Sequence, residues 1–161
     1  SNDYPQTLEY VKQGKNVIVL RTFSKIYGLA GLRIGYAVAK KEIAGLLEKV
    51  RQPFNVNLLA QVAASAALDD EKHVAKSVML NAEGRKYLYG VFIELGLKYA
   101  PTHANFIYVD LCRDTKKTAR FMLERGVIVR QIGEDTAIRV TIGTKEQNER
   151  FVAVLKEALK R

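Results

Sequence analysis

The fold is decided by the stretch Thr22-Phe23-Ser24-Lys25-Ile26-Tyr27-Gly28-Leu29-Ala30-Gly31-Leu32-Arg33-Ile34-Gly35-Tyr36. Before it, residues 16–23 form a short apolar, β-branched run that is typical of a buried strand. The three glycines of the stretch predict a loop, and a second strand begins again at residues 37–39. Lys25 therefore lies where a strand opens into a loop, which is the place where α/β folds bind their ligands.

The polar side chains of this stretch each have a chemical use. The amine of Lys25 can form a Schiff base with an aldehyde cofactor, and pyridoxal phosphate is an aldehyde that then acts as an electron sink. The hydroxyls of Thr22 and Ser24 lie on one side if the chain stays extended, and they can bind phosphate oxygens. Arg33 adds a permanently charged, fork-shaped phosphate donor. The alternative interpretation is that Lys25 is an ordinary surface lysine.

Beyond this stretch the sequence predicts further helices and strands. Helices are predicted at residues 40–51, 57–68 and 70–95, followed by a strand at 104–111, a helix from Asp114 to Glu124, strands at 127–130 and 137–142, and a last helix opened by a capping box at Thr144 and Gln147. The helix at 70–95 is long enough to bridge two domains. We therefore expect one domain at residues 1–70, and the linking helix with a smaller domain at residues 71–161.

The composition limits the classes of function. The chain has 161 residues, of which 48% are hydrophobic and 27% charged, as in globular proteins. Its net charge of +9 would suit nucleic acid, but the basic residues are scattered beside acids and no nucleic-acid-binding motif is present. No apolar run suits a membrane span and no signal peptide opens the chain, so we expect a cytoplasmic protein. Two separated histidines and the single Cys112 predict no metal site.

Residues 22–36 resemble the lysine segment of class I and II aminotransferases of fold type I, in the version typical of histidinol-phosphate aminotransferases. The resemblance continues, in family order, through Arg51-Gln52-Pro53-Phe54-Asn55-Val56-Asn57, Ala104-Asn105-Phe106-Ile107, Gly126-Val127-Ile128-Val129-Arg130 and Ile138-Arg139-Val140-Thr141-Ile142-Gly143-Thr144. It implies an α/β fold, in which this chain supplies the end of the large α/β domain and the small α+β domain. It also implies pyridoxal 5'-phosphate as cofactor and a homodimer as the active form.

The resemblance assigns roles to individual residues. Lys25 matches the catalytic lysine that carries the cofactor, while Thr22, Ser24 and Arg33 match residues that hold the cofactor phosphate. Arg139 matches the arginine that binds the acidic group of the amino substrate, and Arg130 matches a second arginine nearby. The alternative is that both arginines are surface charges at strand edges. This alternative suits Arg139 less than Arg130, since an arginine inside an apolar strand usually has a partner. The implied reaction moves an amino group between L-histidinol phosphate and 2-oxoglutarate in histidine biosynthesis.

One departure from the family is large. Family members are considerably longer, and the half that precedes the lysine strand supplies a glycine-containing cofactor loop, a stacked aromatic ring, and the Asn and Asp that contact the pyridine. This sequence resembles only the carboxyl-terminal half, so we expect a fragment that is inactive alone. Three alternatives remain open: an aminotransferase for aromatic or other amino acids, a decarboxylase like those acting on threonine phosphate, or a catalytically silent dimerising remnant.

Overall fold

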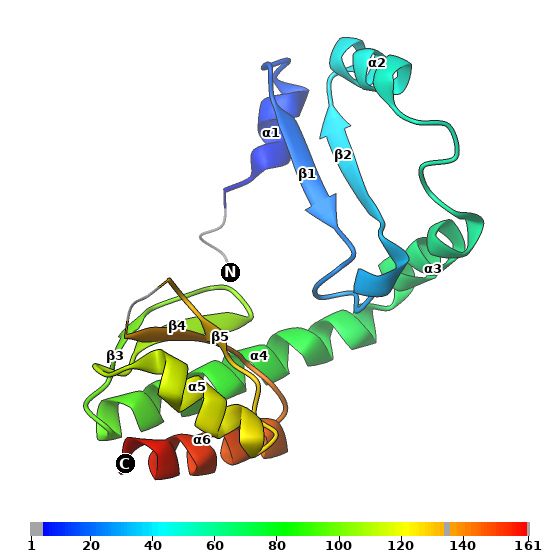
Figure 1. The fold of residues 1–161 in the computed structure, drawn as a ribbon. Coiled ribbons are helices and arrows are strands. Elements are labelled where there is room, and N and C mark those ends of the chain that lie inside the picture. Colours follow the sequence, from blue (N-terminus) through cyan, green and yellow to red (C-terminus); the bar gives the residue numbers. More distant parts are fainter. Residues whose placement is uncertain (1–4, 134–135, 161) are drawn as a thin grey trace. The chain divides into compact units, whose positions relative to one another are not determined.

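The computed structural model describes residues 5–133 and 136–160 (Figure 1). Its elements are α1 (Thr7–Lys12), β1 (Ile18–Thr22), the 3-10 turn η1 (Ala30–Leu32), β2 (Gly35–Ala39), α2 (Lys41–Val50), α3 (Leu58–Asp69), α4 (Glu71–Glu94), β3 (Lys98–Ala100), β4 (Phe106–Asp110), α5 (Thr115–Glu124), β5 (Arg130–Gln131), β6 (Ala137–Thr141) and α6 (Lys145–Leu159). The chain forms two compact units, Ser1–Lys76 and Ser77–Arg161. The division falls inside α4, whereas the sequence placed the boundary at residue 70, just before that helix begins.

The first unit is built on a two-stranded antiparallel sheet. Strand β1 pairs with β2 from Ile18 opposite Ala39 to Thr22 opposite Gly35. The strands approach so closely at Gly35 that a Cβ there would lie 2.7 Å from the carbonyl oxygen of Arg21, so only glycine fits. Both strands and the helices α2 and α3 lie where the sequence predicts them. Because the sheet has only these two strands in the described part of the chain, it buries few side chains, and Leu20 in β1 remains 71% exposed.

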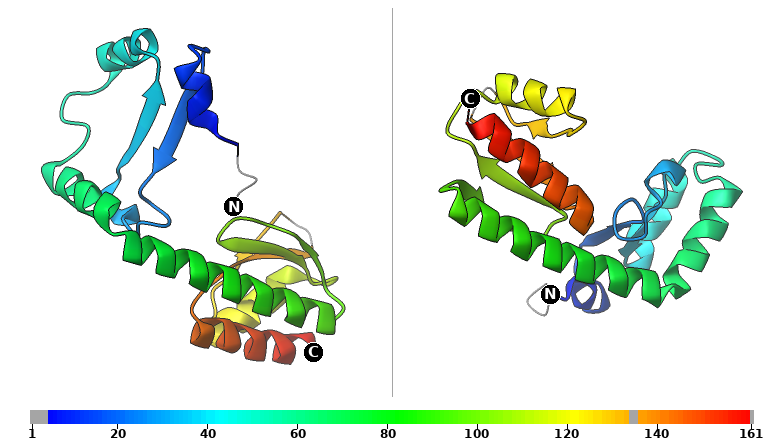
Figure 2. Two further views of the ribbon diagram at one scale, coloured as in Figure 1. Left: turned by 180° about the vertical axis from the view of Figure 1, so that it is seen from behind. Right: turned by 90° about the horizontal axis from the view of Figure 1, so that it is seen from below.

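The second unit packs three helices on one face of an antiparallel sheet. The strand order is β3-β4-β6-β5, and Figure 2 shows α6 lying between α4 and α5 on the same face. The core lies between the sheet and these helices. Its buried side chains are Leu88, Val91, Phe92, Ile107, Val109, Leu111, Met122, Val127, Ile138, Val140, Ile142, Phe151, Val152, Val154 and Leu155. The other face of the sheet carries side chains that alternate with these.

Local signals at helix ends in the second unit are confirmed. The carboxylate of Asp114 accepts hydrogen bonds from the backbone N–H groups of Lys116 and Lys117 and so caps α5. Thr144 and Gln147 form the predicted capping box at the start of α6. Gly126, with φ of +71°, ends α5 in the left-handed conformation that favours glycine. None of the described helices is long and apolar enough to cross a membrane.

Two sequence predictions of strands need correction. The strand predicted at residues 127–130 is wrong for most of its length, because β5 covers only Arg130–Gln131. The backbone N–H of Val127 instead donates to the carbonyl of Met122, and Ile128 is 84% exposed outside any strand. Strand β3 was not predicted, since its three residues are too short to show an alternating pattern.

Candidate functional site

The loop after β1 is anchored by the buried side chain of Phe23. Its ring, 4% exposed, lies 5.0 Å from the ring of Tyr27 and 5.8 Å from that of Tyr36, measured between centroids. Its backbone N–H donates to the carbonyl of Ile34 at 3.2 Å, and its own carbonyl accepts from Leu29 at 3.0 Å. This packing holds the chain two residues before Lys25. It therefore positions the turn from Lys25 to Gly28, called the lysine turn below.

Lys25 begins a tight turn whose side chain is exposed. The backbone N–H of Gly28 donates to the carbonyl of Lys25 at 2.9 Å, and Gly28 has a φ of +71°, which glycine adopts without strain. A ring nitrogen of His73 lies 2.9 Å from the carbonyl oxygen of Ile26 and ties the same turn to the start of α4. The amine of Lys25 has no partner among the described residues, so it is available for chemistry.

The other predicted cofactor residues, Thr22, Ser24 and Arg33, lie in or after β1. Their backbone conformation differs from the extended one that the sequence predicts. The chain does not stay extended after Thr22, because Oγ1 of Thr22 accepts a hydrogen bond from the backbone N–H of Ser24 at 3.0 Å. Arg33 is left-handed with φ of +53°, and its Nη1 donates to the carbonyl of Ala30 at 2.7 Å. Two hydroxyls and a guanidinium without a described carboxylate partner are donors that suit a phosphate group.

In the second unit the predicted arginines lie directly opposite each other. Arg130 of β5 pairs with Arg139 of β6, and Tyr108 of β4 pairs with Arg139 from the other side, so the three share one face of the sheet. The side chain of Arg139 is half-buried, and its Nε is buried without a hydrogen-bond partner among the described residues. Its Cζ lies 4.6 Å from the centroid of the Phe106 ring.

No described carboxylate neutralises these two arginines. Asp110 lies on the same face in β4, but the hydroxyl of Thr136 and the backbone N–H of Cys112 donate to its carboxylate, and these bonds lower its pKa. Two like charges on paired residues of neighbouring strands are unfavourable, and so is a buried N–H without an acceptor. An anion bound between them would relieve both terms, which makes this face a candidate anion site.

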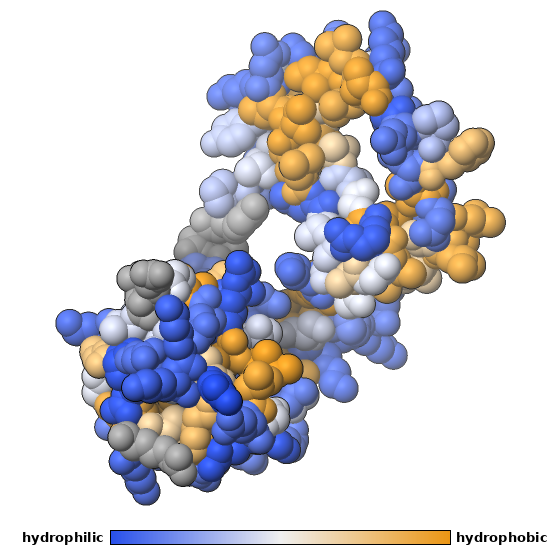
Figure 3. Space-filling view, in the orientation of Figure 1, coloured by the Kyte–Doolittle hydropathy of each residue, from blue (hydrophilic) through white to orange (hydrophobic). Residues whose placement is uncertain are grey.

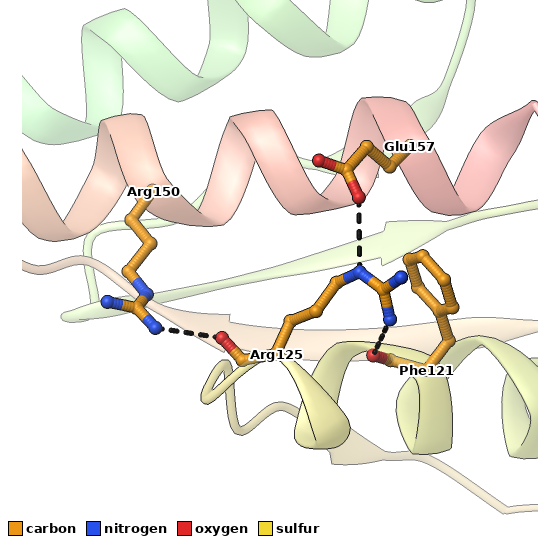
Figure 4. A network of polar contacts seen from close by, with 4 residues as sticks. All are labelled: Phe121, Arg125, Arg150 and Glu157. Atoms are coloured by element: carbon orange, nitrogen blue, oxygen red, sulfur yellow. Dashed lines mark hydrogen bonds and ion pairs between the residues drawn. The ribbon is translucent and has the colours of Figure 1, made fainter.

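Another arginine of the same unit shows what a structural arginine looks like here. Arg125 also stacks on a phenylalanine, with Cζ 3.5 Å from the ring centroid of Phe121. Its Nε donates to Glu157 at 3.1 Å and its Nη1 to the carbonyl of Phe121 at 3.4 Å, while its own carbonyl accepts from Arg150 (Figure 4). Arg125 is therefore satisfied by the protein, whereas Arg139 is not.

The structure thus forms two separate groups of predicted site residues. Thr22, Ser24, Lys25 and Arg33 belong to the first unit, and Arg130 and Arg139 to the second. Within the second unit, Phe106 and Tyr108 lie on the same face of the sheet as Arg130 and Arg139, called the arginine face below, although no pattern in the sequence assigns them a role. Their alternation with the buried Ile107 and Val109 is the signal that could have placed them there.

Comparisons with known proteins agree on one family. The model of the family described as aminotransferase class I and II matches residues 1–155. The histidinol-phosphate aminotransferase of Moorella thermoacetica is 61% identical over 160 residues, which are 97% of this chain and 42% of that protein. The crystal structure of histidinol-phosphate aminotransferase from Sinorhizobium meliloti in complex with pyridoxal-5'-phosphate has a TM-score of 0.81 and 32% identity, covering 90% of this chain and 41% of that one. The chain spans less than half the length of these relatives.

Proposed function

Because this chain belongs to the aminotransferase class I and II family, we propose that it forms part of an enzyme that moves an amino group between L-histidinol phosphate and 2-oxoglutarate, with pyridoxal 5'-phosphate as cofactor. The fold is the α/β fold of the fold-type-I transferases, as predicted from the sequence. The single observation that carries the proposal is the exposed amine of Lys25, held at the head of a tight turn.

The residues of the first unit suit the cofactor. The hydroxyls of Thr22 and Ser24 and the guanidinium of Arg33 would hold its phosphate, and Lys25, at the head of the turn closed by Gly28, would supply the amine for its aldehyde. When bound, pyridoxal phosphate supplies an electron sink for the substrate carbon that loses its proton. The amine of Lys25 would hold the cofactor when no substrate is bound, and once free it would accept and return the substrate's proton as a general base and acid.

The arginine face of the second unit suits the acidic group of the amino donor. Arg139 and Arg130 are cross-strand partners that bring two positive charges to one face of the sheet, which matches the charge of a phosphate dianion better than that of a single carboxylate. This pairing favours L-histidinol phosphate over an aromatic amino acid as donor. A donor such as threonine phosphate carries the same anion, so the decarboxylase alternative must be tested by its product.

The proposal concerns a protein with the full length of the relatives, called the full-length product below, because this chain spans less than half of that length. In the family that the sequence resembles, the residues that stack on and pair with the pyridine ring come from the half that precedes the lysine strand. We therefore expect the 161-residue chain alone to bind the cofactor weakly and to be inactive. We place the activity in the cytoplasm, where amino-acid biosynthesis takes place and where the single Cys112 stays reduced.

An assay of the full-length product with three donors tests the proposed function. We expect 2-oxoglutarate-dependent amino transfer with kcat/KM highest for L-histidinol phosphate, because two arginines bind its phosphate. L-Phenylalanine and L-threonine phosphate serve as competing substrates, and release of carbon dioxide from the latter is measured in parallel. A higher kcat/KM for phenylalanine would contradict the substrate, and a folded product without activity on any donor would leave the silent remnant as the better interpretation.

A homodimer is also part of the proposal. Hydrophobic residues lie on the surface of the first unit, over the two-stranded sheet and over α3 (Figure 3). Phe54 in the loop before α3 is 97% exposed, and Leu58 and Leu59 at the start of α3 are 72% and 77% exposed. Adjacent exposed apolar side chains of this kind are typical of an interface.

Light scattering of the full-length product should therefore give the mass of a dimer. Leu59→Glu should shift the product toward monomer, because it places a charge in the proposed interface. Leu123→Glu, which changes an exposed leucine of α5 that is 56% exposed, is the matched control and should leave the mass unchanged. A monomeric wild-type product at high concentration would refute the dimer.

A further inference from the structure

The guanidinium of Arg139 lies over the ring of Phe106, with Cζ 4.6 Å from the ring centroid. The two residues lie diagonally on neighbouring strands, since Phe106 pairs with Thr141 and Arg139 with Tyr108. Diagonal neighbours of this kind are within reach when one is aromatic and the other long. The side chain of Phe106 is itself half-buried, so packing against its neighbours restricts the orientation of its ring.

We propose that Phe106 is a positioning residue for Arg139, holding the guanidinium in its anion-binding orientation without neutralising its charge. The inference rests on the proposed function only in taking Arg139 as a ligand of the donor's acidic group. It goes beyond that function by naming the side chain that orders the arginine and by explaining why an aromatic ring occupies the place.

The reason for a ring lies in how an arginine can be held. A carboxylate partner would also fix the side chain, but it would use two N–H groups and cancel the positive charge that the substrate needs. An aromatic face attracts the cation and restricts its rotamers while leaving all five N–H donors free. Phe106 therefore prepares Arg139 for binding, because less side-chain freedom is lost when the anion arrives.

Two observations in the same unit support this distinction. Arg125 stacks on Phe121 but also donates to Glu157, and that combination leaves it little capacity for a ligand. Arg139 has the ring without the carboxylate, and its buried Nε–H still lacks an acceptor. The same kind of stacking thus occurs for one arginine that has a carboxylate partner and for another that has none among the described residues.

The experiment follows the Nε–H signal of Arg139 by NMR in the 161-residue chain labelled with ¹⁵N-arginine, and titrates the chain with inorganic phosphate. In the wild type this signal should carry a ring-current shift and should move on addition of phosphate. Phe106→Leu should remove the ring-current shift and weaken phosphate binding by about 2-fold to 12-fold, the cost of immobilising one flexible side chain. Phe106→Tyr keeps an aromatic face and should restore both properties.

Two controls separate positioning from a loss of structure. Phe121→Leu removes the ring under Arg125, where hydrogen bonds remain, and should leave phosphate binding unchanged. Thermal unfolding of each variant identifies any that fail to fold. If Phe106→Leu is among them, Phe106→Met takes its place, because methionine is a flexible apolar side chain without an aromatic face. If Phe106→Leu folds and binds phosphate as well as the wild type, Phe106 does not position Arg139, although the proposed function stands. If wild-type Arg139 does not respond to phosphate, the assignment of Arg139 to the anion fails as well.

Discussion

Lys25→Ala in the full-length product is expected to lower kcat for amino transfer by at least about 1000-fold, because it removes both the attachment point of the cofactor and the group that moves the proton. The fold should survive this change. Lys25 is exposed and its amine contacts no described residue, so the free energy of unfolding should change by less than about 0.5 kcal/mol. A loss of activity with an unchanged unfolding midpoint would assign the effect to chemistry.

The attachment itself is measured by reduction. Incubation with pyridoxal phosphate followed by borohydride should add a phosphopyridoxyl group to the peptide that contains Lys25, and Lys25→Ala should abolish that label. Lys41→Ala, which changes an exposed lysine at the start of α2, is the matched control and should keep both label and activity. If the label appears on another lysine while Lys25→Ala stays active, the assignment of the catalytic residue is wrong.

Gly84→Ala is expected to destabilise the second unit by about 1–3 kcal/mol, because α4 presses on the start of α6 at this position. A Cβ on Gly84 would lie 2.6 Å from Cγ2 of Ile142 and 2.7 Å from Nδ2 of Asn148. Asn148 cannot yield easily, since it is 3% exposed and bonds both the N–H and the carbonyl of Gly143. The loss should appear as a lower urea midpoint for unfolding of the 161-residue chain.

Gly90→Ala provides the control on the same helix. A Cβ at Gly90 meets nothing within 4 Å, so alanine there should stabilise the chain by about 0.5–1 kcal/mol through its higher helix propensity. The two substitutions are chemically identical and should act with opposite sign. Equal effects from both would mean that α4 and α6 are not in close contact at Gly84.

The elements that the sequence predicted well are those specified by neighbouring residues. Asp114 caps α5 and Thr144 with Gln147 caps α6 through side chains that reach only the next turn, so their signals are local. The strand predicted at residues 127–130 failed for a different reason. Val127, Ile128 and Val129 have strong strand propensity, but the chain turns back on α5 after Gly126, and the register with β6 decides where β5 begins.

The candidate site also has parts that depend on neighbouring residues and parts that depend on strand register. The turn around Lys25 closes through contacts within a few residues, and its place after a strand was predictable from the glycines and the apolar run before it. The prediction missed that the chain bends at once after Thr22, because a threonine hydroxyl that captures a nearby backbone N–H competes with the extended form. The stacking of Phe106 on Arg139 depends on the register of β4 and β6, which no local pattern specifies.

The pairing of β4 with β6 also determines when the arginine face can form during synthesis, relative to the lysine turn. The lysine turn joins strands that are adjacent in sequence and is tied by His73, so it can be complete once the start of α4 has left the ribosome. The arginine face needs β6, which lies close to the end of this chain, to insert between β4 and β5. A ribosome that stalls between these two points is expected to carry a nascent chain with a formed lysine turn and without the proposed anion site.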